Sequence, residues 1–223
     1  MPRALSAIVF DLDGTLIDSV PDLHAAGNML LAERGLEPID LPTARRFVGD
    51  GGRVFVRRAL AERGVTLDDE DLTAATERFI ALYEAHASDR TLPYPDVPET
   101  LEKLKAAGYR LGICTNKPER ATHKVLALLG LDHLFEAIVG GDTLPVRKPD
   151  PEHAAEVLRR LGVAPEAACM VGDNEHDSSA GRGAGMRFIL MRYGYARTPL
   201  EEIPADARLD RFRDLPDTLA SLA

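Results

Sequence analysis

Several features that identify other classes of protein are missing from this sequence of 223 residues. No apolar run approaches the ~20 residues that a membrane-spanning helix needs, and no internal repeat or low-complexity tract is present. The formal net charge of −9 argues against nucleic acid or an anionic membrane as the main partner, because both repel an acidic protein. We therefore expect neither a nucleic-acid partner nor membrane association.

Cysteine and histidine are too few and too scattered to form a disulfide framework or a zinc site. Cys114 and Cys169 both lie inside apolar runs typical of strands, where a thiol serves as a small buried hydrophobe. The six histidines form no HxxxH pair and no cluster with cysteine. Because Met1–Leu5 lead directly into an apolar run, no room remains for a signal peptide, and we expect a cytoplasmic protein.

What is present, 45% apolar and 28% charged residues, is typical of a globular protein with one core and room for a satellite domain. Helical periodicity predicts helices over residues 20–34, 42–48, 54–63 and 69–86. The rest alternates between short apolar strands and helices. Strands are predicted at 7–10, 110–116, 137–140, 169–172, 188–191 and 206–210. Helices are predicted at 99–107, 118–129, 151–161, 177–184 and 214–222.

Repeated strand–helix units predict an α/β fold, in which a doubly wound, Rossmann-like parallel sheet is covered by helices on both faces. The four helices before residue 89 are predicted to form an insertion between the first strand and the rest of the α/β fold. We therefore expect an α/β core made of residues 1–18 and 89–223, with an inserted α-helical cap at residues 19–88.

Two carboxylates follow the first predicted strand. Ala7–Phe10 run into Asp11-Leu12-Asp13-Gly14-Thr15, and ligands of open α/β sheets bind at the carboxyl ends of the strands. Strand alternation sends Asp11 and Asp13 the same way, so their charges repel unless a divalent cation or a shared proton relieves them. The alternative is a capping residue followed by a solvated turn.

Polar residues also follow the next two strands. Thr115 and Asn116 offer a hydroxyl and main-chain N–H groups at a helix start, which suits a phosphate, although Thr-Asn is also a common capping pair. Lys148 lies beside Pro149 in Arg-Lys-Pro-Asp-Pro, where its ammonium could neutralise a phosphoryl group. The alternative is an ordinary solvated lysine.

The fourth strand ends in Gly-Asp-Asn-Glu-His-Asp. Asp173 and Asp177 lie one helical turn apart at the start of a helix, where carboxylates can bind a ligand or only complement the helix dipole. We interpret His176, which lies between them in the sequence, as an exposed helix residue and not as a base.

Taken together, these four motifs, in this order, resemble those of the haloacid dehalogenase superfamily of phosphotransferases. The resemblance covers the whole chain, and the helical insertion is similar to the first cap class of that superfamily. Local matches at residues 47–52, 115–118, 140–142 and 192–195 resemble bacterial phosphoglycolate phosphatases. Phosphatases of amino-sugar phosphates and of pyrophosphate share parts of these local matches.

The resemblance implies a mechanism. Asp11 would be the nucleophile that forms an aspartyl-phosphate. The cofactor would be Mg²⁺, with Asp11 and Asp173 as side-chain ligands and Asp13 as a ligand through its main-chain carbonyl oxygen. The side chain of Asp13 would protonate the leaving alkoxide and then deprotonate water. Dehalogenases lack this second aspartate, so its presence favours oxygen leaving groups.

The remaining residues of the motifs would support this chemistry. By the same resemblance, Thr115, the main chain of Asn116 and Lys148 would hold the phosphoryl oxygens. Asp177 would lie behind them and orient Lys148 or a metal-bound water.

We expect the cap to close over the core and exclude water, with hinges near residues 17–19 and 91–93. The candidate specificity loop is Gly49-Asp50-Gly51-Gly52, where glycines permit close approach to a substrate; an ordinary interhelical turn is the alternative. Arg53 and Arg57 could add a cation beside the substrate or could be solvated surface charges.

The leading functional hypothesis is Mg²⁺-dependent hydrolysis of a small phosphorylated metabolite, with 2-phosphoglycolate first. A phosphatase of an amino-sugar phosphate or pyrophosphate, and a mutase similar to β-phosphoglucomutase, are the alternatives. A catalytically idle interaction protein is disfavoured, because Asp11, Asp13, Lys148 and Asp173 are all present. The sequence does not predict the oligomeric state.

Overall fold

The structure of the chain, a computed structural model, describes residues 5–86 and 89–222. The expected lead of Met1–Ala4 into the first strand and the expected end of the cap at residue 88 fall outside these ranges. No helix of the described part is long and apolar enough to cross a membrane.

Six strands of the described residues form one parallel sheet in the order β5-β4-β1-β6-β7-β8. The apolar residues of all but the edge strand β8 are buried almost completely, as expected for a parallel sheet covered on both faces. The strands are β1 (Ala7–Phe10), β4 (Arg110–Cys114), β5 (Ala137–Val139), β6 (Ala168–Gly172), β7 (Arg187–Met191) and β8 (Ala207–Leu209). The predicted doubly wound sheet is confirmed.

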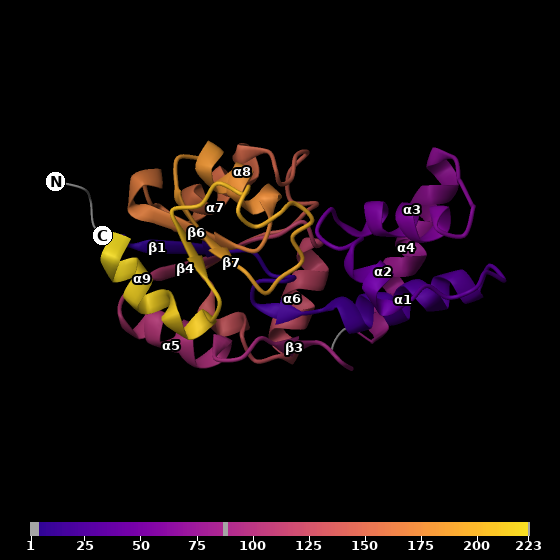
Figure 1. Ribbon diagram of the computed structural model, residues 1–223, viewed down its shortest axis with the longest axis horizontal. Coiled ribbons are helices and arrows are strands. Elements are labelled where there is room, and N and C mark those ends of the chain that lie inside the picture. Colours follow the sequence, from indigo (N-terminus) through magenta and orange to yellow (C-terminus); the bar gives the residue numbers. More distant parts are fainter. Residues whose placement is uncertain (1–4, 87–88, 223) are drawn as a thin grey trace.

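Helices cover both faces of this sheet (Figure 1). Successive residues of a strand point to opposite faces, so Ile8 and Phe10 join one apolar cluster while Ala7 and Val9 join the other. The first cluster contains α5 (Val97–Ala106), α6 (Glu119–Leu128) and α9 (Leu215–Leu222). The second contains α7 (Pro151–Leu161) and α8 (Glu175–Gly183).

The strand order reverses direction at β1. Strands β4 and β5 follow on one side of it, whereas β6, β7 and β8 follow on the other. Connections on the two sides of such a reversal leave the sheet toward opposite faces, which opens a crevice at the carboxyl ends of the central strands. The residues after β1, β4 and β6 therefore meet at this point.

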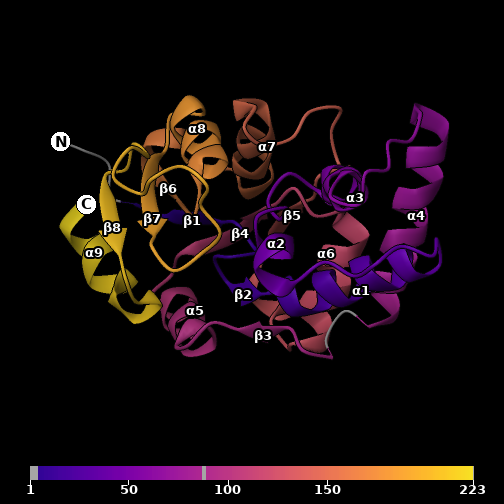
Figure 2. The ribbon, with the colours of Figure 1, turned by 45° about the vertical axis from the view of Figure 1, so that its right-hand side comes forward.

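The inserted helices form a second unit with its own apolar cluster beyond the carboxyl end of the sheet (Figures 1 and 2). Phe55 is its centre, stacked on Phe79 at 5.0 Å between ring centroids and edge-on to Phe47 at 6.1 Å. The helices are α1 (Val20–Ala32), α2 (Leu41–Arg45), α3 (Gly52–Ala61) and α4 (Asp69–Ala85). The helix predicted to reach Val48 ends at Arg45, and turns lead on to the glycine-rich loop.

The two connections between core and insertion pair with each other. Strands β2 (Ile17–Asp18) and β3 (Leu92–Pro93) form a short antiparallel ladder, which the sequence analysis missed because two residues carry no periodicity. Asp22, in the first turn of α1, accepts hydrogen bonds from the Thr91 main chain at 2.8 Å and from its hydroxyl at 2.6 Å. The expected hinges therefore lie side by side and are linked to each other.

Candidate active site

The loop after β1 folds back tightly on itself. The N–H of Asp11 continues the ladder to Val171, and the carbonyl of Leu12 then accepts hydrogen bonds from the N–H groups of Leu16 and Ile17. Gly14 has a positive φ of 99°, and a Cβ there would lie 2.6 Å from Asp173 Oδ2. Only glycine allows the loop to lie this close to the end of β6.

Lys148 connects the ends of three segments. Its ammonium nitrogen lies 2.6 Å from Asp11 Oδ1 and 2.7 Å from Asp177 Oδ1, and its side chain is 2% exposed. The other oxygen of Asp177 accepts hydrogen bonds from the main-chain N–H groups of Asp173 and Asn174. Asp177 is therefore placed where the sequence analysis expected it, behind the site and against Lys148; its role stays a prediction.

The buried carboxylates perturb one another. Burial and the Asp177 charge raise the pKa of Asp11 to about 7, against the opposing effect of Lys148. Burial, Asp177 and Asp11 also raise the pKa of Asp173. Burial would lower the pKa of Lys148, but Asp11 and Asp177 together raise it, so the ammonium stays charged. A single lysine thus faces three aspartates.

This cluster fits a divalent metal. Oxygen atoms of Asp11, Asp173 and Asp177 lie within 4.8 Å of one another, and all three residues are buried. Both oxygens of Asp177 and both oxygens of Asp173 already accept hydrogen bonds, so the choice of Asp11 and Asp173 as the side-chain ligands stays a prediction. Because Mg²⁺ prefers carboxylate oxygens and would relieve the uncompensated charge, the donor set suits this ion.

The residues after β4 connect the core to the glycine-rich loop. The predicted strand over 110–116 ends at Cys114, so Thr115 and Asn116 leave the sheet as a turn before α6. The Asn116 amide nitrogen donates to the carbonyl oxygens of Gly49, at 2.9 Å, and of Lys148, at 3.0 Å. The side chain of Asn116 is thus a link between cap and core, while its main-chain role toward phosphate stays a prediction.

A second buried lysine was missed by the sequence analysis. Lys117 Nζ lies 2.8 and 3.0 Å from the two oxygens of Asp13, and 4.5 Å from the centre of the Tyr83 ring of α4. Burial by itself lowers the pKa of Lys117, but Asp13 and Tyr83 raise it above the ordinary value. Its position directly after Thr115-Asn116 was the available signal, but a lysine before a helix is usually solvated.

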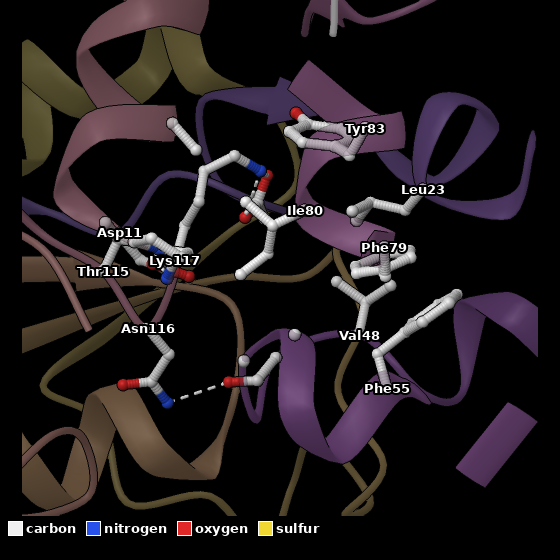
Figure 3. A pocket seen from close by; sticks show the side chains of 16 residues that line it. Asp11, Leu23, Val48, Phe55, Phe79, Ile80, Tyr83, Thr115, Asn116 and Lys117 are labelled. Atoms are coloured by element: carbon white, nitrogen blue, oxygen red, sulfur yellow. Dashed lines mark hydrogen bonds and ion pairs between the residues drawn. The ribbon is translucent and has the colours of Figure 1, made fainter. Parts of the chain in front are cut away.

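These residues surround a cavity between the core and the inserted helices (Figure 3). The core side contributes polar groups, and the side formed by α1, α3, α4 and the loop before α3 is apolar. The core residues are Asp11, Asp13, Thr115, Asn116, Lys117, Pro118 and Ala121. The facing residues are Leu23, Val48, Gly49, Gly51, Gly52, Phe55, Phe79, Ile80 and Tyr83. The expected loop thus reaches the cavity through its glycines.

Asp50, in the same loop, points away from the cavity into a polar cluster. Its carboxylate lies 2.5 Å from Arg58, 2.5 Å from Arg197 and 2.7 Å from His176. Although burial raises the pKa of Asp50, hydrogen bonds from His176 and Arg197 bring it well below its usual range. The interpretation of His176 as a plain exposed residue is wrong, because its ring is mostly buried against Asp50.

Neither of the two candidate arginines lines the cavity. Arg53 donates to Thr73 at 2.7 Å and to Asp69 at 2.6 Å, both on α4. Arg57 is exposed, in agreement with the solvated alternative. The expectation that one of them supplies a cation beside the substrate therefore finds no support in this arrangement.

Comparison with known proteins agrees with this geometry. A sequence model of the haloacid dehalogenase-like hydrolases matches residues 5–185. A phosphoglycolate phosphatase of Cereibacter sphaeroides (strain ATCC 17029) is 42% identical over 98% of this chain and 99% of its own length. Phosphoglycolate phosphatase 1 of Pseudomonas aeruginosa is 42% identical over 93% of this chain and 77% of its own length.

Solved structures share the fold. The crystal structure of a predicted phosphoglycolate phosphatase from Haemophilus somnus 129PT has a TM-score of 0.90 and 32% identity, covering 96% of this chain and 97% of its own. CbbY from Rhodobacter sphaeroides, solved with phosphate, has a TM-score of 0.78 and 29% identity, covering 95% and 96%. The resemblance seen in the sequence motifs is thereby confirmed, and the chain belongs to the haloacid dehalogenase-like hydrolase family.

Proposed function

We propose that this protein is a Mg²⁺-dependent phosphatase that hydrolyses 2-phosphoglycolate through an aspartyl-phosphate on Asp11. The observation that carries the proposal is the position of Asp11, which lines the cavity while Lys148 holds one of its oxygens at 2.6 Å. The names of the relatives that are 42% identical support the choice of substrate.

In the first half-reaction, an Asp11 oxygen attacks phosphorus and the bond from phosphorus to the ester oxygen breaks. Lys148 fixes the orientation of the Asp11 carboxylate and offers positive charge close to the phosphoryl oxygens. Thr115 lines the same side of the cavity and can donate its hydroxyl to them. Mg²⁺, held by Asp11, Asp173 and the main-chain oxygen of Asp13, would supply the charge neutralisation that lets one anion approach another.

Asp13 serves both half-reactions. Its carboxylic acid gives a proton to the leaving alkoxide, and the resulting carboxylate then takes a proton from water, which attacks the phosphorus of the aspartyl-phosphate. Inorganic phosphate leaves and the Asp11 carboxylate is restored. Asp13 lines the cavity two residues after Asp11, so both carboxylates can reach one bound ester.

The apolar side of the cavity limits the access of water. Val48, Phe55 and Phe79 cover the polar core residues, which lowers the local dielectric and strengthens the interactions of Lys148 with charged oxygens. Among the described lining residues, charged side chains lie only on the core side, where Asp13 can position water that enters.

A substrate panel tests the proposal. Release of phosphate is measured from 2-phosphoglycolate, glucosamine 6-phosphate, pyrophosphate and glucose 6-phosphate, each with and without Mg²⁺. We expect kcat/KM to be highest for 2-phosphoglycolate, and turnover to require the metal. A higher kcat/KM on pyrophosphate or the amino-sugar phosphate would make that compound the substrate in place of 2-phosphoglycolate. Interconversion of glucose 1-phosphate and glucose 6-phosphate would show that the protein is a mutase.

The nucleophile is tested separately. Asp11→Asn should lower turnover by at least about 10³-fold, the scale seen when a nucleophile is removed. Acid quenching during steady turnover of labelled substrate should leave label on the wild-type chain and none on the variant. Label that persists in the Asp11→Asn variant would assign the nucleophile to another residue.

A further inference from the structure

We propose that Lys117 determines substrate specificity. Its ammonium would exchange the carboxylate of Asp13 for the carboxylate of the substrate. The inference rests on the proposed function, because only an ester with an acidic group close to its phosphate would use such a cation. It concerns the end of the substrate that takes no part in the phosphoryl transfer.

The distribution of charge around the cavity leads to this residue. Among the described residues that line the cavity, Lys117 is the one cation, and its ammonium is paired with the carboxylate of Asp13. Lys148 lies behind Asp11 and is not part of the lining. Arg53 is bound to α4, and Arg57 is exposed elsewhere on α3.

The apolar side of the cavity strengthens the argument. A carboxylate that enters with the substrate meets Leu23, Val48, Phe55, Phe79 or Ile80 on that side (Figure 3). An unpaired carboxylate is expensive to bury in such surroundings. The substrate therefore gains most when its carboxylate reaches the Lys117 ammonium.

Lys117 is well placed for this contact. Its main chain comes two residues after Thr115, where it is held by a hydrogen bond from its N–H to the Thr115 hydroxyl. Its ammonium extends between Asp13 of the core and the ring of Tyr83 on α4. A ligand whose phosphate lies at Thr115 and whose carboxylate is a few bonds away can thus reach the ammonium of Lys117.

The exchange also affects catalysis. Lys117 holds both oxygens of Asp13, at 2.8 and 3.0 Å, whereas the proposed reaction needs Asp13 to contact the leaving oxygen. A substrate carboxylate that takes over the ammonium releases Asp13 for this contact. An ester without a carboxylate leaves Asp13 bound to Lys117, so it should show a low kcat as well as a high KM.

The test compares 2-phosphoglycolate with ethyl phosphate, which has a methyl group in place of the carboxylate. The ratio of their kcat/KM values is measured in the wild type and in Lys117→Met and Lys117→Gln, at saturating Mg²⁺. We expect the neutral variants to reduce this ratio by about 100-fold, since a site built to pair a polar group discriminates strongly. The kcat on ethyl phosphate should not fall in Lys117→Met, because that variant no longer holds Asp13 away from the leaving oxygen.

Lys124→Met is the matched control. Lys124 lies on α6, the helix that begins two residues after Lys117, and also contacts α4, through the Glu84 carbonyl oxygen, but it is exposed and outside the cavity. Its substitution should leave the ratio unchanged. The melting temperature of each variant shows that it is folded, and Lys117→Gln can still donate to Asp13 if Lys117→Met is too unstable to assay.

Two outcomes overturn the inference. If Lys117 only positions Asp13, its variants slow both esters by the same factor and the ratio stays at the wild-type value. If the ratio falls equally in Lys124→Met, the effect comes from the contact between α6 and α4.

A second pair of esters, 2-phospholactate and isopropyl phosphate, separates this inference from the proposed function. If the wild type does not hydrolyse 2-phosphoglycolate but hydrolyses 2-phospholactate faster than isopropyl phosphate, and Lys117→Met abolishes that difference, the proposed substrate is wrong and the role of Lys117 stands. If Lys117→Met still hydrolyses 2-phosphoglycolate with the wild-type preference over ethyl phosphate, the proposed substrate stands and the role of Lys117 is wrong. If no carboxylated ester is preferred, both proposals fail.

Discussion

Lys148 and Lys117 are both buried lysines, and each is paired with an aspartate of the loop after β1, but their surroundings differ. Lys148 is 2% exposed and lies between Asp11, in the loop after β1, and Asp177, in the first turn of α8, so both of its charged partners belong to the core. Lys117 is 4% exposed, lines the cavity and lies against Tyr83 of the inserted helices.

This difference in surroundings indicates that the two lysine–aspartate pairs have different roles. The partners of Lys148 lie in the loop after β1 and on α8, and both are buried with it, so two ion pairs hold its ammonium in place. Lys117 has one carboxylate partner, and the side chain of Asp13 is 12% exposed, so a ligand can compete for the ammonium. A fixed charge suits phosphoryl transfer, and an exchangeable one suits recognition.

The largest expected effect comes from breaking the fixed pair. Lys148→Met should lower kcat/KM by about 10²–10³-fold on every ester, because a preorganised charge at the phosphoryl group is lost. It also leaves Asp11 and Asp177 buried without a cation, which should cost roughly 3–5 kcal/mol of stability in urea unfolding. Lys117→Met should cost less, since Asp13 can be hydrated; an equal stability loss in the two variants would contradict the comparison.

Asp173→Ala should chiefly weaken Mg²⁺ binding. We expect the Mg²⁺ concentration needed for half-maximal activity to rise by about 10–100-fold, with partial recovery of turnover at high metal. Glu175→Ala, which removes a neighbouring carboxylate at the start of α8, is the control and should leave the metal dependence unchanged. An unaltered Mg²⁺ titration of Asp173→Ala would exclude this residue as a ligand.

The pKa of Asp11 predicts how the metal-free protein responds to pH. Its folded-state pKa, about 7, lies above the ordinary 3.8, so between these values the folded protein binds more protons than the unfolded chain. The stability that this group contributes is therefore complete below pH ~4 and is lost as the pH rises through about 7. Asp11→Asn cannot ionise, so it should not lose this stability as the pH rises.

We therefore expect metal-free Asp11→Asn to gain stability over the wild type from pH 4 to 7, by ~1–3 kcal/mol at neutral pH. Urea unfolding in the presence of a chelator at several pH values measures this difference. Addition of Mg²⁺ should stabilise the wild type more than the variant. A difference between the two proteins that does not change with pH would contradict the assigned cause.

The smallest effect is expected at the contact between Arg197 of the core and Asp50 of the cap. Arg197 joins Asp50 of the glycine-rich loop, and Arg197→Ala should raise KM less than about 10-fold, because a partly exposed ion pair is worth only ~1 kcal/mol. Arg192→Ala, an exposed arginine with ion pairs at 3.6 Å that do not involve the cap, is the control. A loss as large as that of Lys117→Met would mean that cap closure, and not the ammonium, sets specificity.

Much of the core of the site could be predicted from the sequence. Short apolar runs ending in Asp11, Thr115 and Asp173 predict parallel strands, and the carboxyl ends of parallel strands meet at one edge. The clustering of these three residues therefore follows from periodicity and strand order, whereas the position of Lys148 beside them was implied by the family resemblance. The division of the chain at residues 18 and 88, and the chemical role of each side chain, stay predictions.

What only the tertiary structure decided is which residues far apart in the sequence contact one another. Lys117 and Asp13 are 104 residues apart, and His176 and Asp50 are 126 apart. The pairing of β2 with β3 joins the two ends of the insertion, and the bond from Asn116 to Gly49 joins the core to the insertion. Such contacts depend on where the inserted helices lie over the sheet, and this position is set by packing that leaves no periodic signal in the chain.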